Sequence, residues 1–598
     1  MCGICGIFGT APVNMPTVDQ MVSNMIHRGP DDSASLTFDG FSIGHTRLSI
    51  QDPENSLQPM VSHSGDSVIT FNGEIYNQDE LRLKLPDKEW KTSGDTELLI
   101  ELLECFGIEV LASIEGMFAF GWFSMKKKEL VLARDRMGEK PLFFRSENSY
   151  VQFASELRSL LTSKRKFSDI NIEGLAHYLK YLYFPSTASV YSDIKCLEPG
   201  NFIKFTSESF SIGNWTEFGN HKDNSKPRTD LRSLISESVR KSLISDVPIG
   251  VMLSGGVDSS IIAFEAAKYS DDLFTYSFVM PGHSDDSKYA RLMSQRLKTR
   301  HIEIPFDKEL LPEIILDTLS KTSQPFGDTS IIPLRILTRK ASEDVKVLLS
   351  GDGADELFSG YQYYDKYFNV EKKSGDWNYF TEVASIRVRH LIRQLTPTQQ
   401  REMLRKLSLE YQKTTTFESW SEDIAICNTK TVQDLFGFNK VKFVKKSGDG
   451  SQGSLSDVLA WDQATYLPND ILFKSDMGGM LSSVEIRAPF LNPRIVEYAN
   501  DLKNFPALPS KESLKELYRD VIPVEILTRK KQGFGAPVKN WLSIGLLDEL
   551  VEEYVYKKTL PVYQILKYKK VLVECKRNPT FLWNLLSLNV WLKANVPN

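Results

Sequence analysis

The stretch VPIGVMLSGGVDSSIIAF, residues 247–264, decides how the second half of the chain folds. Its apolar beginning predicts a buried strand, and its apolar end predicts a helix. Between them, residues 254–260 carry two adjacent glycines, which let the backbone approach an anion closely, and serines whose hydroxyls can donate to it. The helix that follows points free N–H groups and the positive end of its dipole at the same place. This order predicts a phosphate-binding loop rather than a simple Gly-Ser turn.

The segments around this loop alternate between strand and helix patterns. The expected strands are 247–254, 273–280, 301–306 and 345–350, and the expected helices are 259–270, 289–298 and 331–344. Such alternation, with solidly apolar strands, predicts a parallel sheet with helices on both faces. Beyond about residue 360 the pattern predicts mainly helices.

Residues 1–205 have a different pattern. Short apolar or alternating runs, bounded by Gly, Asn, Asp and Ser, predict many strands and few helices, and therefore packed sheets. One helix is expected at 95–107, where Asp95 can cap the first turn and Gly107 can end the last.

A polar segment separates the two patterns. Residues 206–228 are interrupted by Gly and Pro, so we assign them to a linker. A second domain is expected over 229–598, beginning at a helix that Thr229 would cap.

The overall composition excludes several classes of function. The 598 residues are 41% hydrophobic and 25% charged, and the formal net charge of -5 gives no support to nucleic-acid binding. No apolar run approaches the ~20 residues needed to span a bilayer, and the first residues lack the features of a secretory signal. Six scattered cysteines are too few for a disulfide framework. We therefore expect a reduced, cytoplasmic protein with no nucleic acid and no membrane among its partners.

Cys2 follows the initiator methionine and is a candidate nucleophile. Because cysteine is small, Met1 is expected to be removed, which would place the Cys2 thiol beside a free α-amine. That amine has an ordinary pKa of about 7.7–8.0, so part of it is neutral at pH 7 and can accept the thiol proton. Its position alone favours the other interpretation, that Cys2 is only a small apolar residue near a chain end. The motifs that follow decide between the two.

Six motifs follow one another along the first domain. They are MCGICGIFG, HRGPDD, RLSI, FNGEIYN, SGDTE and ARDRMGEKPLFF. This ordered set resembles the N-terminal-nucleophile glutamine amidotransferases, and especially the asparagine synthetases. The resemblance implies a sandwich of two antiparallel sheets flanked by helices, in which the nucleophile attacks the side-chain amide of glutamine and releases ammonia.

The resemblance also implies roles for residues of these motifs. Cys2 would be the nucleophile, and Asn72 and Gly73 would form the oxyanion hole through a side-chain amide and a backbone N–H. Donors aimed at a developing oxyanion contribute about 2.7–4 kcal/mol each. Arg47 would bind the α-carboxylate of glutamine, since a guanidinium matches a carboxylate. The residues expected to bind glutamine are Arg47, Leu48, Ser49, Ile50, Gln51, Asn72, Gly73 and, at its ammonium and amide ends, Glu74 and Asp95.

The second domain resembles the ATP pyrophosphatases, which cleave ATP to AMP and pyrophosphate and form an acyl-adenylate. The loop 254–260 matches their pyrophosphate loop and lacks the GxxxxGK(S/T) pattern of a Walker A loop. The segment VKVLLSGDGADELFSGYQYY resembles the part of asparagine synthetases at the ATP-binding edge of the sheet. The residues expected to bind ATP are Leu253, Ser254, Gly255, Gly256, Asp258, Ser259, Ser260, Phe278, Ser350 and Gly351.

Three charged residues of this domain are candidates for metal binding or catalysis. Asp258 and Asp352 would share a Mg²⁺ ion. Many relatives have Glu at the position of Asp352, and the shorter side chain leaves open whether it binds metal or acts as a base. The segment LTRKKQGFGAPV supplies Lys531, which the resemblance implies would contact the phosphates and stabilise charge as the adenylate forms and breaks down.

Two further segments resemble the part of the family that lines the acceptor pocket and the interdomain passage. They are QPFGDTSIIPL and YLPNDILFKSDMGGMLSSVEIRAPFLN. Met477 stands where many relatives carry Arg, and Asn492 stands where Asp is commoner. Both are expected near the carboxylate substrate, so they weaken the inference that the acceptor is aspartate.

Together these features predict an α+β sandwich of the N-terminal-nucleophile type followed by an α/β parallel-sheet ATP pyrophosphatase domain with a helical C-terminal part. The expected enzyme hydrolyses glutamine in the first domain, passes ammonia to the second without exposing it to solvent, and there activates a carboxylate, with aspartate expected, as acyl-AMP. ATP and Mg²⁺ are the expected cofactors, and a homodimer is one option for the assembly.

Three alternatives remain beside that prediction. The first is the same chemistry on another carboxylate, such as a sugar acid or a biosynthetic intermediate. The second is a β-lactam-forming relative without glutaminase activity, which Cys2 and its supporting motifs argue against. The third is a non-enzymatic regulator, which the intact loops of both domains argue against.

Overall fold

The computed structural model describes most of the chain. The described residues are 2–9, 11, 15–147, 150–161, 165–216, 230–279, 287–364, 422, 424–437, 455–501, 510–529, 533 and 535–596. Two residues with predicted roles, Thr229 and Lys531, lie outside them.

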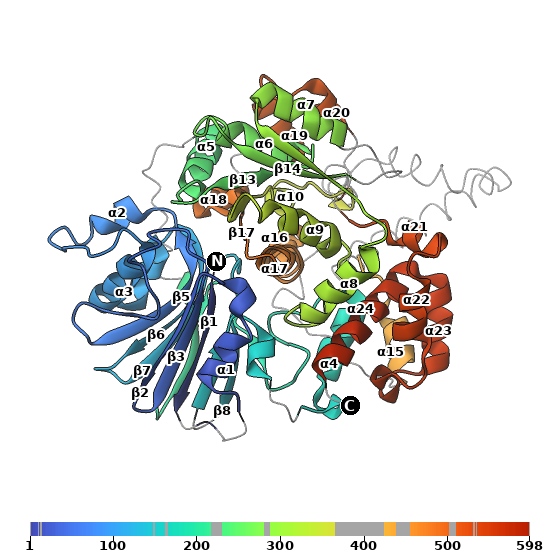
Figure 1. Cartoon of the computed structure of the whole chain (residues 1–598), viewed down its shortest axis with the longest axis horizontal. Coiled ribbons are helices and arrows are strands. Elements are labelled where there is room, and N and C mark those ends of the chain that lie inside the picture. Colours follow the sequence, from blue (N-terminus) through green and yellow to red (C-terminus); the bar gives the residue numbers. More distant parts are fainter. Residues whose placement is uncertain are drawn as a thin grey trace, which may run out of the picture.

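Two six-stranded antiparallel sheets form the first part of the molecule (Figure 1). The strand order is β10-β8-β9-β1-β3-β2 in one sheet and β12-β11-β7-β6-β5-β4 in the other. The strands are β1 (Gly3–Gly9), β2 (Asp32–Phe38), β3 (Phe41–Arg47), β4 (Met60–Val61), β5 (Ser67–Ile75), β6 (Gly116–Ser124), β7 (Glu129–Arg134), β8 (Phe143–Glu147), β9 (Tyr150–Ala154), β10 (Lys195–Cys196), β11 (Asn201–Phe205) and β12 (Phe210–Asn214).

Apolar side chains from both sheets fill the space between them. Phe41 of one sheet stacks on Phe123 of the other, with ring centroids 4.2 Å apart. The helices of this part are α1 (Val18–Ser23), α2 (Gln78–Arg82), α3 (Asp95–Phe106) and α4 (Ile172–Tyr181). Helix α1 covers the first sheet and α3 the second, so the predicted helix-flanked sandwich is confirmed.

The second part is built on a five-stranded sheet with the order β15-β14-β13-β16-β17, in which every neighbouring pair is parallel. Its strands are β13 (Ile249–Met252), β14 (Phe274–Val279), β15 (Arg300–Pro305), β16 (Val347–Leu349) and β17 (Glu485–Arg487). Its helices are α5 (Leu231–Ser242), α6 (Val257–Ala266), α7 (Ser287–Leu297), α8 (Leu311–Lys321), α9 (Ile331–Ala341) and α10 (Ala354–Leu357). The predicted parallel sheet is confirmed, and β17 is a strand that the sequence pattern did not indicate.

Helices cover both faces of this sheet. Val251 and Leu349 share a core with α5, α6 and α7, whereas Tyr276 and Leu348 share another with α9. The C-terminal part is helical where it is described. Its helices are α15 (Thr429–Phe436), α16 (Leu455–Ala464), α17 (Leu472–Met480), α18 (Pro493–Asn500), α19 (Lys511–Leu517), α20 (Val524–Thr528), α21 (Val538–Ser543), α22 (Asp548–Val551), α23 (Tyr568–Arg577) and α24 (Pro579–Asn595).

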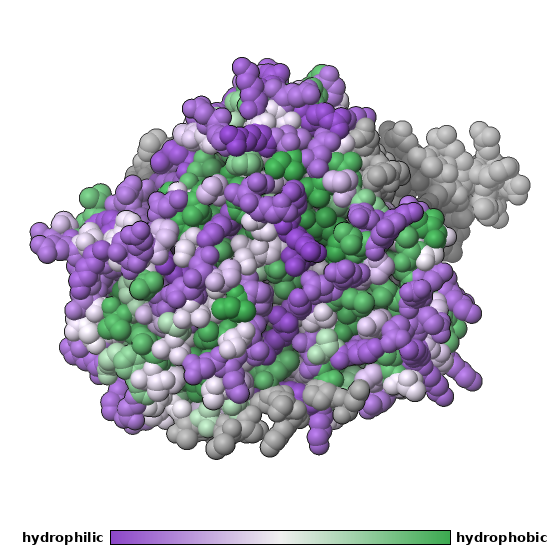
Figure 2. Space-filling model, in the orientation of Figure 1, coloured by the Kyte–Doolittle hydropathy of each residue, from purple (hydrophilic) through white to green (hydrophobic). Residues whose placement is uncertain are grey.

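The two parts of the molecule share one packed core. One apolar cluster contains side chains of both parts, the Tyr178 hydroxyl on α4 donates to the Asn584 carbonyl oxygen on α24 at 3.0 Å, and the Leu157 N–H donates to Ser323 Oγ at 2.7 Å. No helix among the described residues is long and apolar enough to cross a bilayer. Hydrophilic residues occur over the whole face shown in Figure 2, with apolar residues in small groups between them.

Three local expectations differ from the structure. Strand β12 adds to the second sheet of the sandwich inside the segment expected to be a linker. Helix α3 starts at Asp95, but Asp95 is not its cap: its Oδ2 instead accepts the Ile75 N–H at 3.1 Å. Asp230 caps α5 by accepting the Ser233 N–H, in place of the predicted Thr229.

Candidate active site

Cys2 lies buried at the start of β1, beside Asn72 of β5. The Cys2 backbone N–H donates to Asn72 Oδ1 at 2.9 Å, which leaves the Asn72 Nδ2 group pointing elsewhere. This buried Nδ2 has no hydrogen-bond partner among the described residues. A buried donor without a partner lowers the stability of the fold, and an oxygen atom of a bound ligand could accept its hydrogen bond.

Gly73 is closely packed, and the Cys2 thiol is buried. A Cβ on Gly73 would lie 2.3 Å from the Met117 carbonyl oxygen, so a side chain does not fit there. Burial raises the pKa of the Cys2 thiol, which is therefore protonated at rest. Attack by this sulfur requires a base that takes the proton during the reaction, which agrees with the expected role of a free α-amine.

Several residues expected to bind glutamine are joined by hydrogen bonds that start from Arg47. The guanidinium of Arg47 donates to the carbonyl oxygens of Gln51, Asp52 and Pro53 at 3.2, 2.8 and 2.7 Å. The Gln51 side-chain amide in turn donates to Glu74 Oε1. Arg47 thus stabilises the turn that follows it, and this turn places Gln51 next to Glu74.

The remaining members of this set connect the turn to the second domain. The Ser49 N–H donates to Asp31 Oδ2 at 2.7 Å, and the same oxygen accepts from Lys346 Nζ of the second domain at 2.7 Å. Leu48 and Ile50 pack in one small cluster with Val347 of β16 and with Met480. The glutamine-binding segment expected from the sequence therefore rests directly on a strand of the parallel sheet.

Glu74 and Asp95 are buried carboxyl groups with raised pKa values. Burial is the main cause for Glu74, and the neighbouring Asp95 and Glu485 add to it, whereas Arg487 opposes it. Burial raises the pKa of Asp95 to about 7. Arg487 is a cation that already accompanies Glu74, and an α-ammonium group bound beside the two carboxyls would favour their charged forms further.

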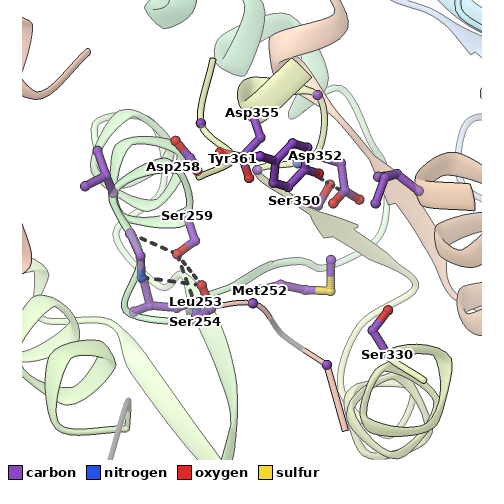
Figure 3. A pocket seen from close by; sticks show the side chains of 18 of the residues that line it. Met252, Leu253, Ser254, Asp258, Ser259, Ser330, Ser350, Asp352, Asp355 and Tyr361 are labelled. Carbon is purple, nitrogen blue, oxygen red and sulfur yellow. Dashed lines mark hydrogen bonds between the residues drawn. The ribbon is translucent and has the colours of Figure 1, made fainter. Parts of the chain in front are cut away.

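A cavity of about 820 Å³ lies at the carboxyl ends of β13 and β16 (Figure 3). These neighbouring strands are where the order of the parallel sheet reverses, the usual position of a ligand crevice in such folds. The predicted residues that line it are Leu253, Ser254, Gly256, Asp258, Ser259, Phe278, Ser350, Gly351 and Asp352. Gly255 and Ser260 do not line it, and the Ser260 side chain is buried.

The loop 254–260 is held in an open shape by its own serines. The hydroxyls of Ser254 and Ser259 lie 3.0 Å apart, and Ser259 Oγ donates to the Gly256 carbonyl oxygen at 3.2 Å (Figure 3). Gly255 has a φ of 70°, which few other residues adopt. No side chain caps the start of α6, so the first N–H groups of that helix remain available for an anion in the cavity.

Charged side chains from distant segments meet in the cavity. Lys511 Nζ lies 2.5 Å from Asp258 Oδ1 and 3.0 Å from Asp355 Oδ1. Burial lowers the pKa of Lys511, but these two carboxylates outweigh it and raise the pKa overall. Asp352 Oδ2 accepts from the Ser350 hydroxyl at 3.0 Å and from the Ser475 hydroxyl at 2.7 Å.

Lys474 of α17 also lines the cavity, and its side chain forms no ion pair among the residues that the structure describes. Burial lowers its pKa, yet nearby carboxylates, led by Asp352 and Asp328, raise the pKa overall, so the ammonium form persists. A buried cation that forms no ion pair with the described residues is a candidate to contact an anionic group of a ligand.

Two residues that we expected near the acceptor do not reach the cavity. Met477 is fully buried in the large apolar core, and Asn492 caps α18 and donates to Glu115 Oε2 at 3.2 Å. Neither residue lines the cavity, because α17 presents Lys474 and Ser475 there and Asn492 contacts the first domain. A direct contact of either residue with the acceptor stays a prediction.

The structure adds four functional candidates that the sequence analysis did not name: Arg28, Lys474, Arg487 and Lys511. Lys474 interrupts an apolar helical run, and Arg487 follows an apolar residue in a short strand. A charged residue next to an apolar run is the signal that could have singled out Lys474, whereas β17 has charged residues at two of its three positions and gives no such signal for Arg487. Their partners come from segments distant in sequence, which no local pattern reveals.

Comparisons with known proteins agree with this geometry. The asparagine synthase family model matches residues 230–593, and the glutamine amidotransferase domain model matches residues 1–216. The glutamine-hydrolyzing asparagine synthetase 1 of Bacillus subtilis (strain 168) is 29% identical, over 100% of this chain and 97% of its own length.

Two further relatives carry the same kind of name. The glutamine-hydrolyzing asparagine synthetase 3 of Bacillus subtilis (strain 168) is 27% identical, over 89% of this chain and 87% of its own length. The glutamine-hydrolyzing asparagine synthetase B of Escherichia coli (strain K12) is 30% identical, over 62% of this chain and 67% of its own length. Because the family model covers more than half of the chain, this protein belongs to the asparagine synthase family and is an ATP-using, glutamine-dependent amidotransferase.

Proposed function

We propose that the acceptor is aspartate and that the product is asparagine. Aspartate has two carboxylates and one ammonium group. One carboxylate is activated, so the pocket must offer a cation to the other carboxylate and an anion to the ammonium. Lys474 supports this proposal as the cation, and Asp328, which lines the same cavity, supports it as the anion. A sugar acid has no ammonium group to balance the carboxylates around Lys474, and it is therefore the second candidate.

In the first half-site, the Cys2 sulfur attacks the side-chain amide carbon of glutamine, and the α-amine of Cys2 takes the thiol proton. The negative charge on the amide oxygen is stabilised by Asn72 Nδ2 and the Gly73 N–H. The C–N bond then breaks, the amine returns the proton to the departing nitrogen, and ammonia leaves. Water hydrolyses the thioester to glutamate and restores the thiol. The unpartnered Asn72 Nδ2 is the observation that supports this assignment.

In the second half-site, a carboxylate oxygen of aspartate attacks the α-phosphorus of ATP and pyrophosphate leaves. The serines and N–H groups of the loop 254–260 are suited to hold the departing pyrophosphate. Ammonia then attacks the acyl carbon, the acyl–oxygen bond breaks, and AMP leaves with the oxygen. Lys531 lies outside the described residues, and its proposed role on the phosphates rests on the family resemblance.

A Mg²⁺ ion fits the donors of this half-site. Asp258 and Asp352 both line the cavity, and Mg²⁺ is usually held by one or two carboxylates together with substrate phosphates. Among the described residues, no group of three or more His, Cys, Asp and Glu side chains is arranged to hold a metal ion by itself. When bound, the ion would neutralise phosphate charge, and the protein would contribute the two aspartates.

An acceptor screen tests the proposal. The purified enzyme would be given ammonium, ATP and Mg²⁺ with aspartate, glutamate, or a panel of sugar acids, and pyrophosphate release and amide formation would be measured. We expect aspartate to have the highest kcat/KM, and Lys474→Met to raise its KM more than it lowers kcat. A higher kcat/KM for a sugar acid than for aspartate would overturn the assignment.

A further inference from the structure

Arg487 is a fully buried arginine on β17, and its guanidinium reaches into the first domain. Its Nη2 lies 2.8 Å from Glu74 Oε2, and its Nε lies 2.6 Å from Glu485 Oε1. Its Nη1 donates to the carbonyl oxygens of Ser242 and Ile244 at 2.8 and 2.6 Å. The side chain therefore joins the glutamine side of the molecule to the end of α5.

The main chain of the same residue contacts the other half-site. Leu349 of β16 is the register partner of Arg487, and the Arg487 carbonyl oxygen accepts the Ser350 N–H at 2.9 Å. Ser350 lines the cavity at the carboxyl ends of β13 and β16, which is the proposed ATP site and is called the ATP cavity below. Its hydroxyl donates to Asp352. One residue thus holds Glu74 with its side chain and the start of the 350–356 loop with its backbone.

A second contact between the half-sites lies close by. The carbonyl oxygen of Ile50, in the glutamine-binding segment, accepts the Asp246 N–H at 3.0 Å. The Asp52 N–H donates to Asp246 Oδ2 at 2.7 Å. The segment that surrounds the glutamine site therefore contacts the residues that lead into β13, in addition to the packing of Leu48 and Ile50 against Val347 of β16.

We propose that Arg487 is a positioning residue, which orients the Glu74 carboxylate for glutamine and ties that orientation to the 350–356 loop of the ATP cavity. The proposal rests on the proposed role of Glu74 in glutamine binding, but it does not depend on which acid is the acceptor. Glutamine then binds best when the ATP cavity is filled, because a nucleotide that orders Ser350 also fixes the backbone from which Arg487 extends.

The buried environment explains why this contact matters for binding. Arg487 is the cation that opposes the rise in the pKa of Glu74 caused by burial and by the neighbouring Asp95 and Glu485. Without Arg487 that pKa would rise further, so Glu74 would hold a proton even beside a bound ammonium group. A neutral Glu74 no longer attracts the α-ammonium of glutamine. Loss of one partner from a buried, hydrogen-bonded charge pair weakens binding by a factor on the order of 30 or more.

The test compares Arg487→Met with a matched control, Arg494→Met. Arg494 also joins the two parts, through Glu115 at 3.3 Å, but its side chain is 45% exposed and it does not contact Glu74. Glutaminase KM and kcat would be measured with and without ATP, together with the glutamate formed per amide. For Arg487→Met we expect KM for glutamine to rise about 30-fold, kcat to change much less, and the effect of ATP on KM to disappear. The control should resemble the parent protein.

An activity assay and a double variant distinguish a loss of folding from a loss of Glu74 positioning. Ammonia-dependent synthesis by the same preparations reports whether the ATP domain is intact. If Arg487→Met is unfolded, Arg487→Lys and Glu74→Gln would be combined, and the double variant should have the same KM as Glu74→Gln alone, since both changes act through one contact. Additive effects, a KM for Arg487→Met close to that of Arg494→Met, or a parent KM that ATP does not change would each overturn the proposal. Loss of activity on aspartate alone would instead contradict the assigned acceptor.

Discussion

Arg28 forms a bidentate ion pair with Asp476, its Nη1 and Nη2 lying 2.9 and 3.0 Å from the two carboxylate oxygens. Arg28 also donates through Nε to the Cys2 carbonyl oxygen at 3.0 Å, and Asp476 belongs to α17, next to Ser475 and its contact with Asp352. The pair therefore connects the backbone of the expected nucleophile to a helix that lines the ATP cavity.

Arg28→Met should strongly destabilise the protein. Both side chains of the pair are fully buried, so the change leaves Asp476 and Glu156 charged without this partner, which costs about 3–5 kcal/mol. Denaturant unfolding would measure the loss. The exposed pair of Arg291 and Glu303 provides the control, since Arg291→Met should cost only about 0–1 kcal/mol. Similar losses in the two variants would contradict the structural role of the buried pair.

Cys2→Ala should abolish glutamine-dependent synthesis and leave ammonia-dependent synthesis within about twofold of the parent. Only the first half-site needs a thiol, and external ammonia replaces the product of that half-site. Glutamate and asparagine would be quantified in parallel. Mass spectrometry of the parent should show that Met1 is absent, and an active enzyme that retains Met1 would contradict the use of the α-amine as base.

Binding of glutamine should weaken at acidic pH. Burial raises the pKa of Asp95 to about 7, so below that pH the group is neutral and cannot hold an ammonium group. KM for glutamine should therefore fall as pH rises through about 7 and level off above it. Glutaminase assays between about pH 5.5 and about pH 8.5 would show this. The groups that share the site are Glu74, Glu485 and Arg487. Asp95→Asn should have a high KM that no longer varies with pH in this range.

Changes in the second half-site should leave glutamine hydrolysis intact. Asp258→Ala removes a carboxylate that lines the ATP cavity and pairs with Lys511, and Lys531→Ala removes the proposed phosphate contact. Each variant should lose pyrophosphate release and amide formation while it still converts glutamine to glutamate. Pyrophosphate release at the parent level in either variant would show that the residue has no role in adenylation.

Most strands of the parallel sheet could be predicted because helices cover both of its faces, which favours apolar residues on both sides of a strand. β13 (IGVM) and β16 (VLL) lie between two layers of helices and contain no polar side chain, and β14 (FTYSFV) adds Thr275 and Ser277 to a mainly apolar and aromatic run. β17 was missed because two of its three residues, Glu485 and Arg487, are charged. Arg487 forms ion pairs with Glu485 and with Glu74, and Glu74 lies more than 400 positions away in the sequence. A pattern of neighbouring residues contains no information about such a partner.

The candidate sites divide in a similar way. The loop 254–260 could be predicted because a strand, glycines and a helix are adjacent in sequence and build the anion site by themselves. The position of Met477 could not, because it depends on which side of α17 faces the cavity, and the helix presents Lys474 and Ser475 there instead. The prediction of Asp95 as a cap was wrong for a related reason. Its carboxylate accepts a hydrogen bond from an N–H of β5, which is distant in sequence, instead of one from the first turn of its own helix.

The nucleotide product should be AMP, and its new oxygen should come from the acceptor. An acyl phosphate and an acyl adenylate would both react with ammonia, but they differ in which phosphorus is attacked. The loop 254–260 has no lysine to reach the β- and γ-phosphates, and its hydroxyls and helix N–H groups are suited to a departing pyrophosphate. With heavy oxygen in the acceptor carboxylate, mass spectrometry should find the label in AMP. Label in inorganic phosphate, with ADP as the second product, would mean that the γ-phosphorus is attacked and that the adenylate mechanism is wrong, even if the amide is still formed.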